Sequence, residues 1–299
     1  MTNLHGILPA LLTPFDEQYR VNTTSLELLL ERVYAGGVHG VYVCGQTGEG
    51  LLQTVDQRKK VAEVALANSP RGKQVVIHVG AYRPEEAFEL ARHASRIGAS
   101  AISSLPLIGA YTFEEVSIYY QKLAAAADLP VLIYFFPDIC PAIQTTGQIV
   151  ELMRIPNVVG LKFTRHNLYE LETLKLTGKI VLNGRDEILS AGLLMGADGG
   201  VGTFYNVIPG AFVELYGLAR NLQWDQARAV QKKINALIRL TLRFPMLQAV
   251  KQMLAWSGID CGPCLMPRRA LTIEETELLQ SALSESVFER ESFALATAK

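Results

Sequence analysis

Short apolar runs recur along the chain, and the segments between them carry apolar residues at helical spacing. The apolar runs cover residues 7–12, 40–44, 74–79, 101–105, 131–134, 158–162, 180–182 and 199–202. The helical patterns cover residues 24–34, 54–67, 84–97, 113–126, 146–153, 168–176 and 186–195. Runs without polar alternation are typical of strands buried on both faces of a parallel sheet. Eight such strands alternating with helices predict an α/β fold, the (β/α)₈ TIM barrel.

The chain continues after the eighth run for longer than one barrel helix requires. Further helical patterns cover residues 210–220, 224–242, 246–256 and 273–293, with breaks at Pro245 and at the loop 258–267. We therefore predict a C-terminal helical extension. We assign residues 1–209 to the barrel core and residues 210–299 to the last barrel helix and the extension.

Composition and charge narrow the range of partners. The 299 residues are 49% hydrophobic, enough to bury a large core in one main domain. Lysine plus arginine number 28 against 29 aspartate plus glutamate, so the net charge of −1 gives no electrostatic reason to expect nucleic acid or an anionic membrane as partner. No run reaches the length of a membrane span, and the first residues lack the pattern of a secretory signal. We expect a cytoplasmic protein that acts on a small molecule.

Two of the four cysteines form the motif Cys261-Gly-Pro-Cys264, which has the spacing of a thioredoxin-type redox pair. A redox pair of that type opens a helix after a strand, whereas this motif follows a helical pattern and precedes Pro267. A zinc site needs four ligands, and no second cysteine pair or histidine pair stands nearby. We expect neither a redox centre nor a metal site.

The most informative residues close two neighbouring apolar runs. Lys162 ends the run 158–162 and Tyr134 ends the run 131–134. If both runs are adjacent parallel strands, the amine and the phenol share one pocket at the carboxyl end of the barrel. A desolvated lysine has a lowered pKa and can attack a carbonyl as a free amine. The alternative for Lys162 alone is a side chain that reaches from the strand end into solvent.

Polar residues follow other predicted strand ends. The sequence Gly45-Gln46-Thr47-Gly48-Glu49 could direct a hydroxyl and backbone N–H groups at a small anion, or could be an ordinary glycine turn before a helix. Asp186 and Glu187 could accept hydrogen bonds from a polyol, and capping of a helix explains them equally well. The glycines of 196–202 indicate close backbone packing around a site or a tight turn.

These segments carry a resemblance to a known family. Residues 45–49 are similar to a GxTGE loop, residues 134–137 to a YNxP strand end, and residues 160–164 to a GxKxT segment that bears a Schiff-base lysine. Together with 183–187 and 196–200, in the same order along nearly the whole chain, they resemble the N-acetylneuraminate lyase and dihydrodipicolinate synthase superfamily of pyruvate-dependent class I aldolases.

The resemblance implies roles for particular residues. Lys162 would form an imine with the keto carbon of a 2-oxo acid, and Tyr134 would relay protons. The imine is itself the electron sink, so no cofactor and no metal is expected. The family also implies a homo-oligomer, commonly a tetramer. The implied substrate-binding residues are Gln46, Thr47, Gly48, Thr164, Gly184, Asp186, Glu187, Val201 and Thr203.

Two positions separate the branches of the family. The synthase branch has an arginine shortly after its strand-five tyrosine, where this chain has Ile139. The lyase branch resembles the chain at Thr164 and at Asp186 and Glu187, which would surround the hydroxylated tail of a sugar acid. We therefore expect a lyase that cleaves a 2-oxo sugar acid, similar to N-acetylneuraminate, to pyruvate and an aldehyde.

The chain departs from the family pattern around the proton relay. Gln46 replaces a serine or threonine, Leu107 or Ile108 replaces an aromatic residue, and Phe135 replaces an asparagine. An amide and an aliphatic side chain cannot relay protons, and Tyr111 is a candidate substitute. The alternatives that remain open are dihydrodipicolinate synthase activity, dehydration of a keto-deoxy sugar acid, and pyruvate binding with little turnover.

Overall fold

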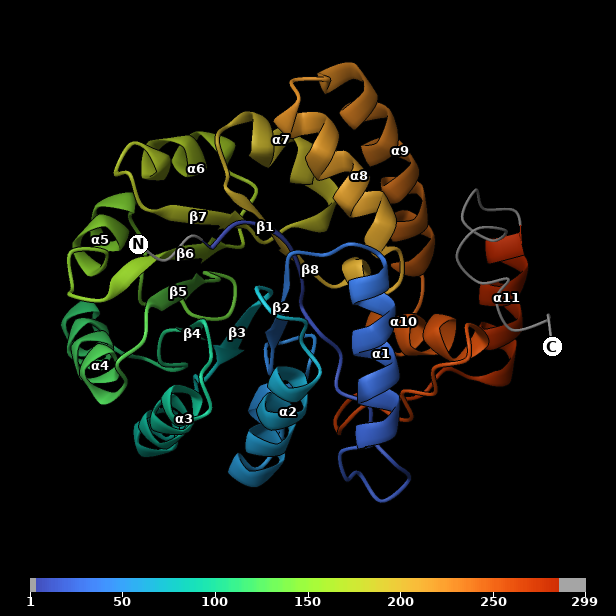
Figure 1. Ribbon diagram of the computed structural model, residues 1–299, viewed down its shortest axis with the longest axis horizontal. Helices are drawn as coiled ribbons and strands as arrows, with labels where there is room; N and C mark the ends of the chain where they lie inside the picture. Colours follow the sequence, from blue (N-terminus) through green and yellow to red (C-terminus); the bar gives the residue numbers. More distant parts are fainter. Residues whose placement is uncertain (1–3, 285–299) are drawn as a thin grey trace.

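The computed structural model describes residues 4–284, in which eight parallel strands form a barrel surrounded by helices (Figure 1). The strands pair in the order β1-β8-β7-β6-β5-β4-β3-β2, and a bridge between Ala10 and Tyr42 joins the two ends of the sheet. The strands are β1 (Gly6–Pro9), β2 (Gly40–Val43), β3 (Gln74–His78), β4 (Ala101–Ser104), β5 (Val131–Phe135), β6 (Val158–Phe163), β7 (Ile180–Asn183) and β8 (Gly199–Gly202). All eight predicted strands and the TIM-barrel fold are confirmed.

One helix follows each strand and packs on the outside of the ring. Threonine side chains begin several of them: Thr54, Thr112 and Thr145 each form a capping box with a Gln or Glu three residues later. The helices of the ring are α1 (Thr23–Ala35), α2 (Val55–Ala67), α3 (Pro84–Arg96), α4 (Phe113–Ala126), α5 (Thr146–Leu152), α6 (Leu168–Lys175), α7 (Leu189–Leu194) and α8 (Pro209–Arg220).

The structure differs from the prediction after β7. Instead of one helix over 186–195, a 3₁₀ turn, Asp186–Ile188, precedes the short helix α7. The Asp186 carboxylate accepts the backbone N–H of Phe204, and the Asp186 carbonyl accepts a hydrogen bond from the Gln231 side chain. These contacts with residues far along the chain accompany the 3₁₀ turn that precedes α7. The spacing of apolar residues within 186–195 does not indicate them.

The buried residues form two layers. A large outer layer fills the space between strands and helices, and a smaller cluster fills the barrel interior. The interior cluster includes Leu8, Tyr42, Leu132, Tyr134 and Leu182. A side chain that points inward from a strand end therefore lies in an apolar environment.

The C-terminal extension consists of α9 (Trp224–Thr241), α10 (Met246–Trp256) and α11 (Ile273–Ser284). Helix α9 packs beside α8, while α10 and α11 lie outside the ring on the side of α1 and α9 (Figure 1). The helix expected over 273–293 begins as predicted, and its end lies outside the described residues. Between residues 4 and 284, no helix combines the length and hydropathy that a bilayer span requires.

All four cysteines are free and buried. Burial raises the pKa of the Cys261 thiol to about 12 and that of Cys264 to about 11, so both thiols remain protonated and unreactive at neutral pH. Residues 4–284 contain no group of three or more metal-ligating side chains.

Candidate active site

Lys162 and Tyr134 are neighbours across two paired strands, as the sequence predicts. Lys162 on β6 stands in register with Tyr134 on β5. Residues in register on parallel strands point to the same side of the sheet, and here that side is the barrel interior. Only 4% of Lys162 and 3% of Tyr134 is exposed, and the amine nitrogen lies 4.1 Å from the centre of the Tyr134 ring. The lysine therefore does not extend into solvent.

The surroundings of the amine are mostly aromatic and apolar. The ring of Tyr42 on β2 is the second face near the lysine, with its centre 4.7 Å from the amine nitrogen. Burial lowers the pKa of Lys162 from its ordinary 10.5 to about 7. The Asp186 carboxylate opposes this shift in pKa and the Arg185 guanidinium adds to it. The lowered pKa makes the neutral amine accessible near neutral pH.

The two phenols beside the amine are held as neutral groups. Burial raises the pKa of both Tyr134 and Tyr42. The Tyr42 hydroxyl donates to the Ser103 hydroxyl at 3.0 Å, which fixes its ring in the barrel interior. Burial also holds the pKa of His78, whose ring lies edge-on to Tyr134, well below its ordinary value. The aromatic groups beside the amine are therefore uncharged in the resting site.

The loop after β2 presents Thr47 to the same site. The hydroxyls of Thr47 and Thr203 share a hydrogen bond, with 2.6 Å between the oxygens, which links the loop to the end of β8. Within residues 4–284 the backbone N–H groups of Thr47 and Gly48 have no protein acceptor. The Gly48 carbonyl accepts hydrogen bonds from Thr13 and Gln53. Thr47 thus has a fixed hydroxyl and unused N–H donors beside it.

Asp186 is the acidic group of the site. It is buried, and one carboxylate oxygen accepts the Phe204 N–H at 2.8 Å. Burial raises its pKa to about 7 despite that hydrogen bond. A Cβ atom at Gly202 would lie 2.0 Å from the other carboxylate oxygen, so a glycine is required there. A carboxyl group with a pKa near 7 can accept a hydrogen bond from a hydroxyl when ionised and donate one to a hydroxyl when protonated.

Thr47, Tyr134, Lys162 and Asp186 line one pocket of about 440 Å³, a volume typical of small-molecule sites. Two of the eleven predicted residues do not line it. The Gly48 carbonyl is used within the loop, and the Glu187 carboxylate bonds to His166 at 2.8 Å and lines an adjacent cavity of about 380 Å³. The predicted residues that do line the pocket are Gln46, Thr47, Tyr134, Lys162, Thr164, Gly184, Asp186, Val201 and Thr203.

Sequence reasoning missed several pocket residues. Arg185, next to Asp186, lies 5.5 Å from the Phe136 ring and pairs with Asp138 at 2.8 Å. Its position directly after β7 was the available signal. The C-terminal extension also reaches the pocket, through Pro245, Met246, Leu247, Gln248, Arg268 and Arg269. Those residues do not follow a strand of the barrel, so the position of strand ends in the sequence does not predict them as pocket residues.

The departures from the family pattern fall in different places. Gln46 lies in the wall between the pocket and a second cavity, of about 610 Å³, which Ile108 and Ile139 also line. Phe135 is buried in the outer layer against Phe163, facing away from Lys162. Tyr111 is 40% exposed and does not line the 440 Å³ pocket. Of the three replacements, only Gln46 adjoins the site in a single chain.

Comparison with known proteins agrees with this geometry. A model of the dihydrodipicolinate synthetase family matches residues 3–286. The chain belongs to this family. It is 35% identical over 293 residues to the N-acetylneuraminate lyase of Rhizobium meliloti, covering 95% of this chain and 94% of that protein. It is 33% identical to N-acetylneuraminate lyase 2 of Escherichia coli O6:H1, with the same coverage.

Solved structures give the same relation. The wild-type sialic acid aldolase of Ruminococcus gnavus superposes with a TM-score of 0.89 at 28% identity, covering 93% of this chain and 95% of that one. The Clostridium difficile protein CdNal, solved with mannosamine, superposes with a TM-score of 0.91 at 28% identity, covering 98% of this chain and 100% of that one. The family predicted from the sequence is confirmed, and so is the likeness to its lyase branch.

Proposed function

We propose that the protein is a class I aldolase that cleaves a 2-oxo sugar acid similar to N-acetylneuraminate into pyruvate and an aldehyde. The observation that carries this proposal is a buried amine with a pKa of about 7, set in register with a phenol at the floor of a polar pocket. The names of the relatives, N-acetylneuraminate lyase and sialic acid aldolase, support the same reaction class.

The proposed reaction begins at Lys162. Its neutral amine attacks the keto carbon, and loss of water gives a protonated imine. Removal of the proton from the 4-hydroxyl then breaks the C3–C4 bond, the aldehyde leaves, and the electron pair enters an enamine. Protonation of C3 and hydrolysis release pyruvate and restore the amine. The imine accepts the electrons, so this sequence needs no metal or cofactor.

Tyr134 is the proposed proton relay. Burial favours its neutral phenol in the resting site, so it begins as a donor. A protonated imine on Lys162 would place a positive charge beside the ring and favour the phenolate. Once the phenol has given its proton to the departing water during imine formation, the phenolate can accept the proton of the 4-hydroxyl when the C–C bond breaks. Thr47 and the free N–H groups of its loop are the proposed contacts for the substrate carboxylate.

The assignment of a sugar acid as substrate depends on the polar and charged residues that line the 440 Å³ pocket. A synthase must bind the second carboxylate of aspartate semialdehyde, and Ile139 offers no charge for it. A charge-assisted hydrogen bond is worth roughly 1.5 to 3 kcal/mol, about ten- to a hundredfold in affinity. Three arginines line the pocket, and each already pairs with a carboxylate: Arg185 with Asp138, Arg268 with Glu49 and Arg269 with Glu275. Asp186, Thr164 and Thr203 supply the hydrogen-bonding groups that a hydroxylated tail requires.

The test compares pyruvate release from a panel of 2-oxo sugar acids, N-acetylneuraminate included, with condensation of pyruvate and aspartate semialdehyde. We expect cleavage of at least one sugar acid to exceed condensation by about tenfold or more in kcat/KM. Faster condensation would assign the protein to the synthase branch. Formation of water and an unsaturated or keto product without an aldehyde would indicate a dehydratase, and imine formation without turnover would indicate a binding protein.

Assembly and location are also proposals. We propose a homo-oligomer, on the family pattern a tetramer. Leu52 and Tyr82 are 41% and 60% exposed beside the cavity that Ile108 and Ile139 line, and such a patch is typical of a subunit contact. We propose the cytoplasm as the compartment, because four free cysteines fit a reducing environment.

A further inference from the structure

Glu49 is a buried carboxylate that lies outside the pocket of the proposed active site. It belongs to the loop that carries Thr47, and only 1% of it is exposed. It does not line the 440 Å³ pocket. Its backbone lies in the left-handed region, with φ of 57°, a conformation that a non-glycine residue keeps only where its surroundings enforce it. The contacts of the side chain show what enforces it.

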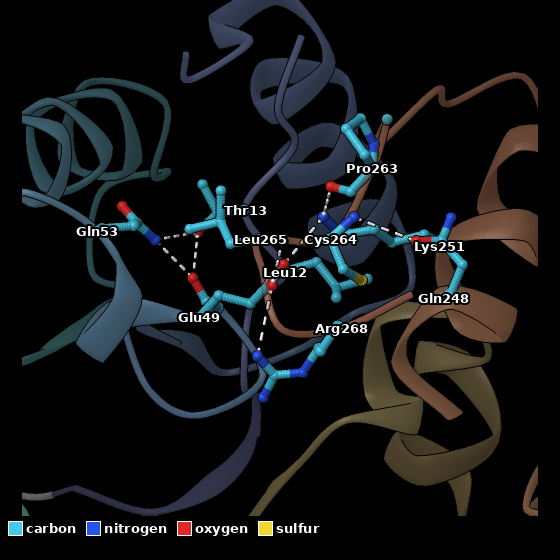
Figure 2. Close-up of polar contacts among 12 residues, drawn as sticks. Leu12, Thr13, Glu49, Gln53, Gln248, Lys251, Pro263, Cys264, Leu265 and Arg268 are labelled. Atoms are coloured by element: carbon cyan, nitrogen blue, oxygen red, sulfur yellow. Dashed lines mark hydrogen bonds and ion pairs between the residues drawn. The ribbon is translucent and has the colours of Figure 1, made fainter. Parts of the chain in front are cut away.

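Within residues 4–284, the charged partners of Glu49 both come from the C-terminal extension (Figure 2). Lys251 of α10, itself 1% exposed, places its amine nitrogen 3.0 Å from one carboxylate oxygen. The other oxygen accepts the Leu265 N–H at 2.7 Å and lies 3.5 Å from the Arg268 guanidinium. The Lys251 amine also donates to the Pro263 carbonyl at 2.7 Å. One carboxylate therefore joins helix α10 and the segment 263–268 to a loop of the barrel.

The same two parts of the extension form a wall of the pocket. Gln248, one turn before Lys251 on α10, lines the pocket and accepts the Cys264 N–H at 3.1 Å. Arg268 lines the pocket at the end of the segment that Glu49 holds. The loop and the extension thus meet at Glu49, and each also contributes groups to the pocket.

A buried ion pair is seldom kept for stability alone, because desolvation of both charges offsets most of their attraction. Such pairs can instead select one arrangement of the parts they join. We propose that Glu49 and Lys251 are positioning residues, whose ion pair fixes the loop of Thr47 relative to the extension and so sets the carboxylate site and the far wall of the pocket together. This inference rests on the proposed function, in which Thr47 binds the substrate carboxylate.

The test uses the full-length chain and pyruvate as probe, with Glu49→Gln, Lys251→Met and the double variant. Borohydride trapping at Lys162 gives two quantities: the pyruvate concentration at half-saturation and the rate at saturation. Loss of either charge should raise the half-saturation concentration by about tenfold or more and change the saturated rate by less than about threefold. The double variant should regain thermal stability, since no unpaired charge remains buried, yet keep the raised half-saturation concentration.

Lys175→Met is the control, at an ion pair whose side chains are 22% and 30% exposed. Lys175 pairs with Asp198 at 2.7 Å and donates to the Lys179 carbonyl, as Lys251 does with Glu49 and Pro263, but it lies at the opposite end of the barrel. It should leave half-saturation unchanged. If half-saturation recovers with stability in the double variant, or is unchanged in both single variants, the pair is only structural and the inference is wrong.

Hydrogen exchange separates this inference from the proposed function. In Glu49→Gln, the backbone amides of 45–50 and of 263–268 should exchange faster together, and the Lys175→Met variant should show no such change. A wild-type protein that forms no pyruvate adduct would refute the proposed function, and exchange would still decide whether the pair holds the two segments. Exchange that is unchanged in Glu49→Gln would overturn the positioning role.

Discussion

Under the proposed function, the burial of Lys162 sets the pH above which its amine can react as a nucleophile. An ordinary lysine with a pKa of 10.5 has only about three neutral amines in ten thousand at pH 7, whereas a pKa of about 7 leaves half of them neutral. The reactive fraction is thus on the order of a thousandfold higher. We expect the rate of imine trapping with saturating pyruvate to rise with pH and to reach its midpoint near pH 7.

Two variants test the cause of the lowered pKa. Arg185→Gln removes a positive charge that disfavours the ammonium form, so the midpoint should move to higher pH. Asp186→Asn removes a carboxylate that favours the ammonium form, so the midpoint should move to lower pH. Because Asp186 also has a pKa of about 7, the wild-type midpoint belongs to the coupled pair, and Asp186→Asn isolates the lysine.

The assay is stopped-flow mixing with pyruvate followed by cyanoborohydride and mass analysis of the Lys162 peptide, between pH 5.5 and 9.5. A small amine of known pKa, trapped in parallel, corrects for the pH dependence of the reagent. A midpoint above pH 9 would show that the amine is not desolvated. Shifts of the same sign in both variants would show that local charges do not set the midpoint.

Three further predictions concern stability, packing and assembly. Lys162→Met should raise the free energy of unfolding at pH 7 and below, where keeping the lysine buried costs the folded protein up to about 5 kcal/mol. The gain should shrink as the pH rises from 7 to 10.5, because in that range the unfolded chain binds more protons than the folded one. Chemical denaturation at pH 7 and at pH 10.5 measures both values. Gly202→Ala should displace the Asp186 carboxylate, lower the free energy of unfolding by about 1 to 3 kcal/mol, and reduce cleavage more than pyruvate trapping. In the control Gly217→Ala the added methyl meets open space, and the free energy of unfolding should rise by about 0.5 to 1 kcal/mol. A Gly202→Ala variant as stable as the wild type would refute the packing argument. Light scattering at micromolar concentration should give a mass several times the 32.8 kDa of one chain, and a monomer would contradict the proposed assembly.

The sequence predicts the barrel and the residues at the floor of the proposed active site because both depend on local patterns. Strands buried on two faces read as apolar runs, and the parallel arrangement brings the ends of neighbouring runs together, so Lys162 and Tyr134 could be paired from the sequence. Phe135 shows the limit of family comparison, since strand alternation turns it away from the site. The break after β7 depends on contacts with Phe204 and Gln231, which lie far along the chain and leave no local signal.

The two ends of the pocket make opposite physical demands, and different parts of the chain meet them. The floor must stay dry to keep Lys162 neutral, and the interior-facing residues of the strands provide that dryness. The mouth must form hydrogen bonds with the hydroxyl groups of the proposed substrate. Its polar wall consists of Arg185 and of Gln248 and Arg268 from the extension. Because the mouth residues lie outside the barrel interior, substitutions there can change which aldehyde fits while the amine below keeps its low pKa. If the proposed function holds, the imine chemistry depends on the interior of the barrel, and we expect the choice of sugar acid to depend on the position of the extension against it.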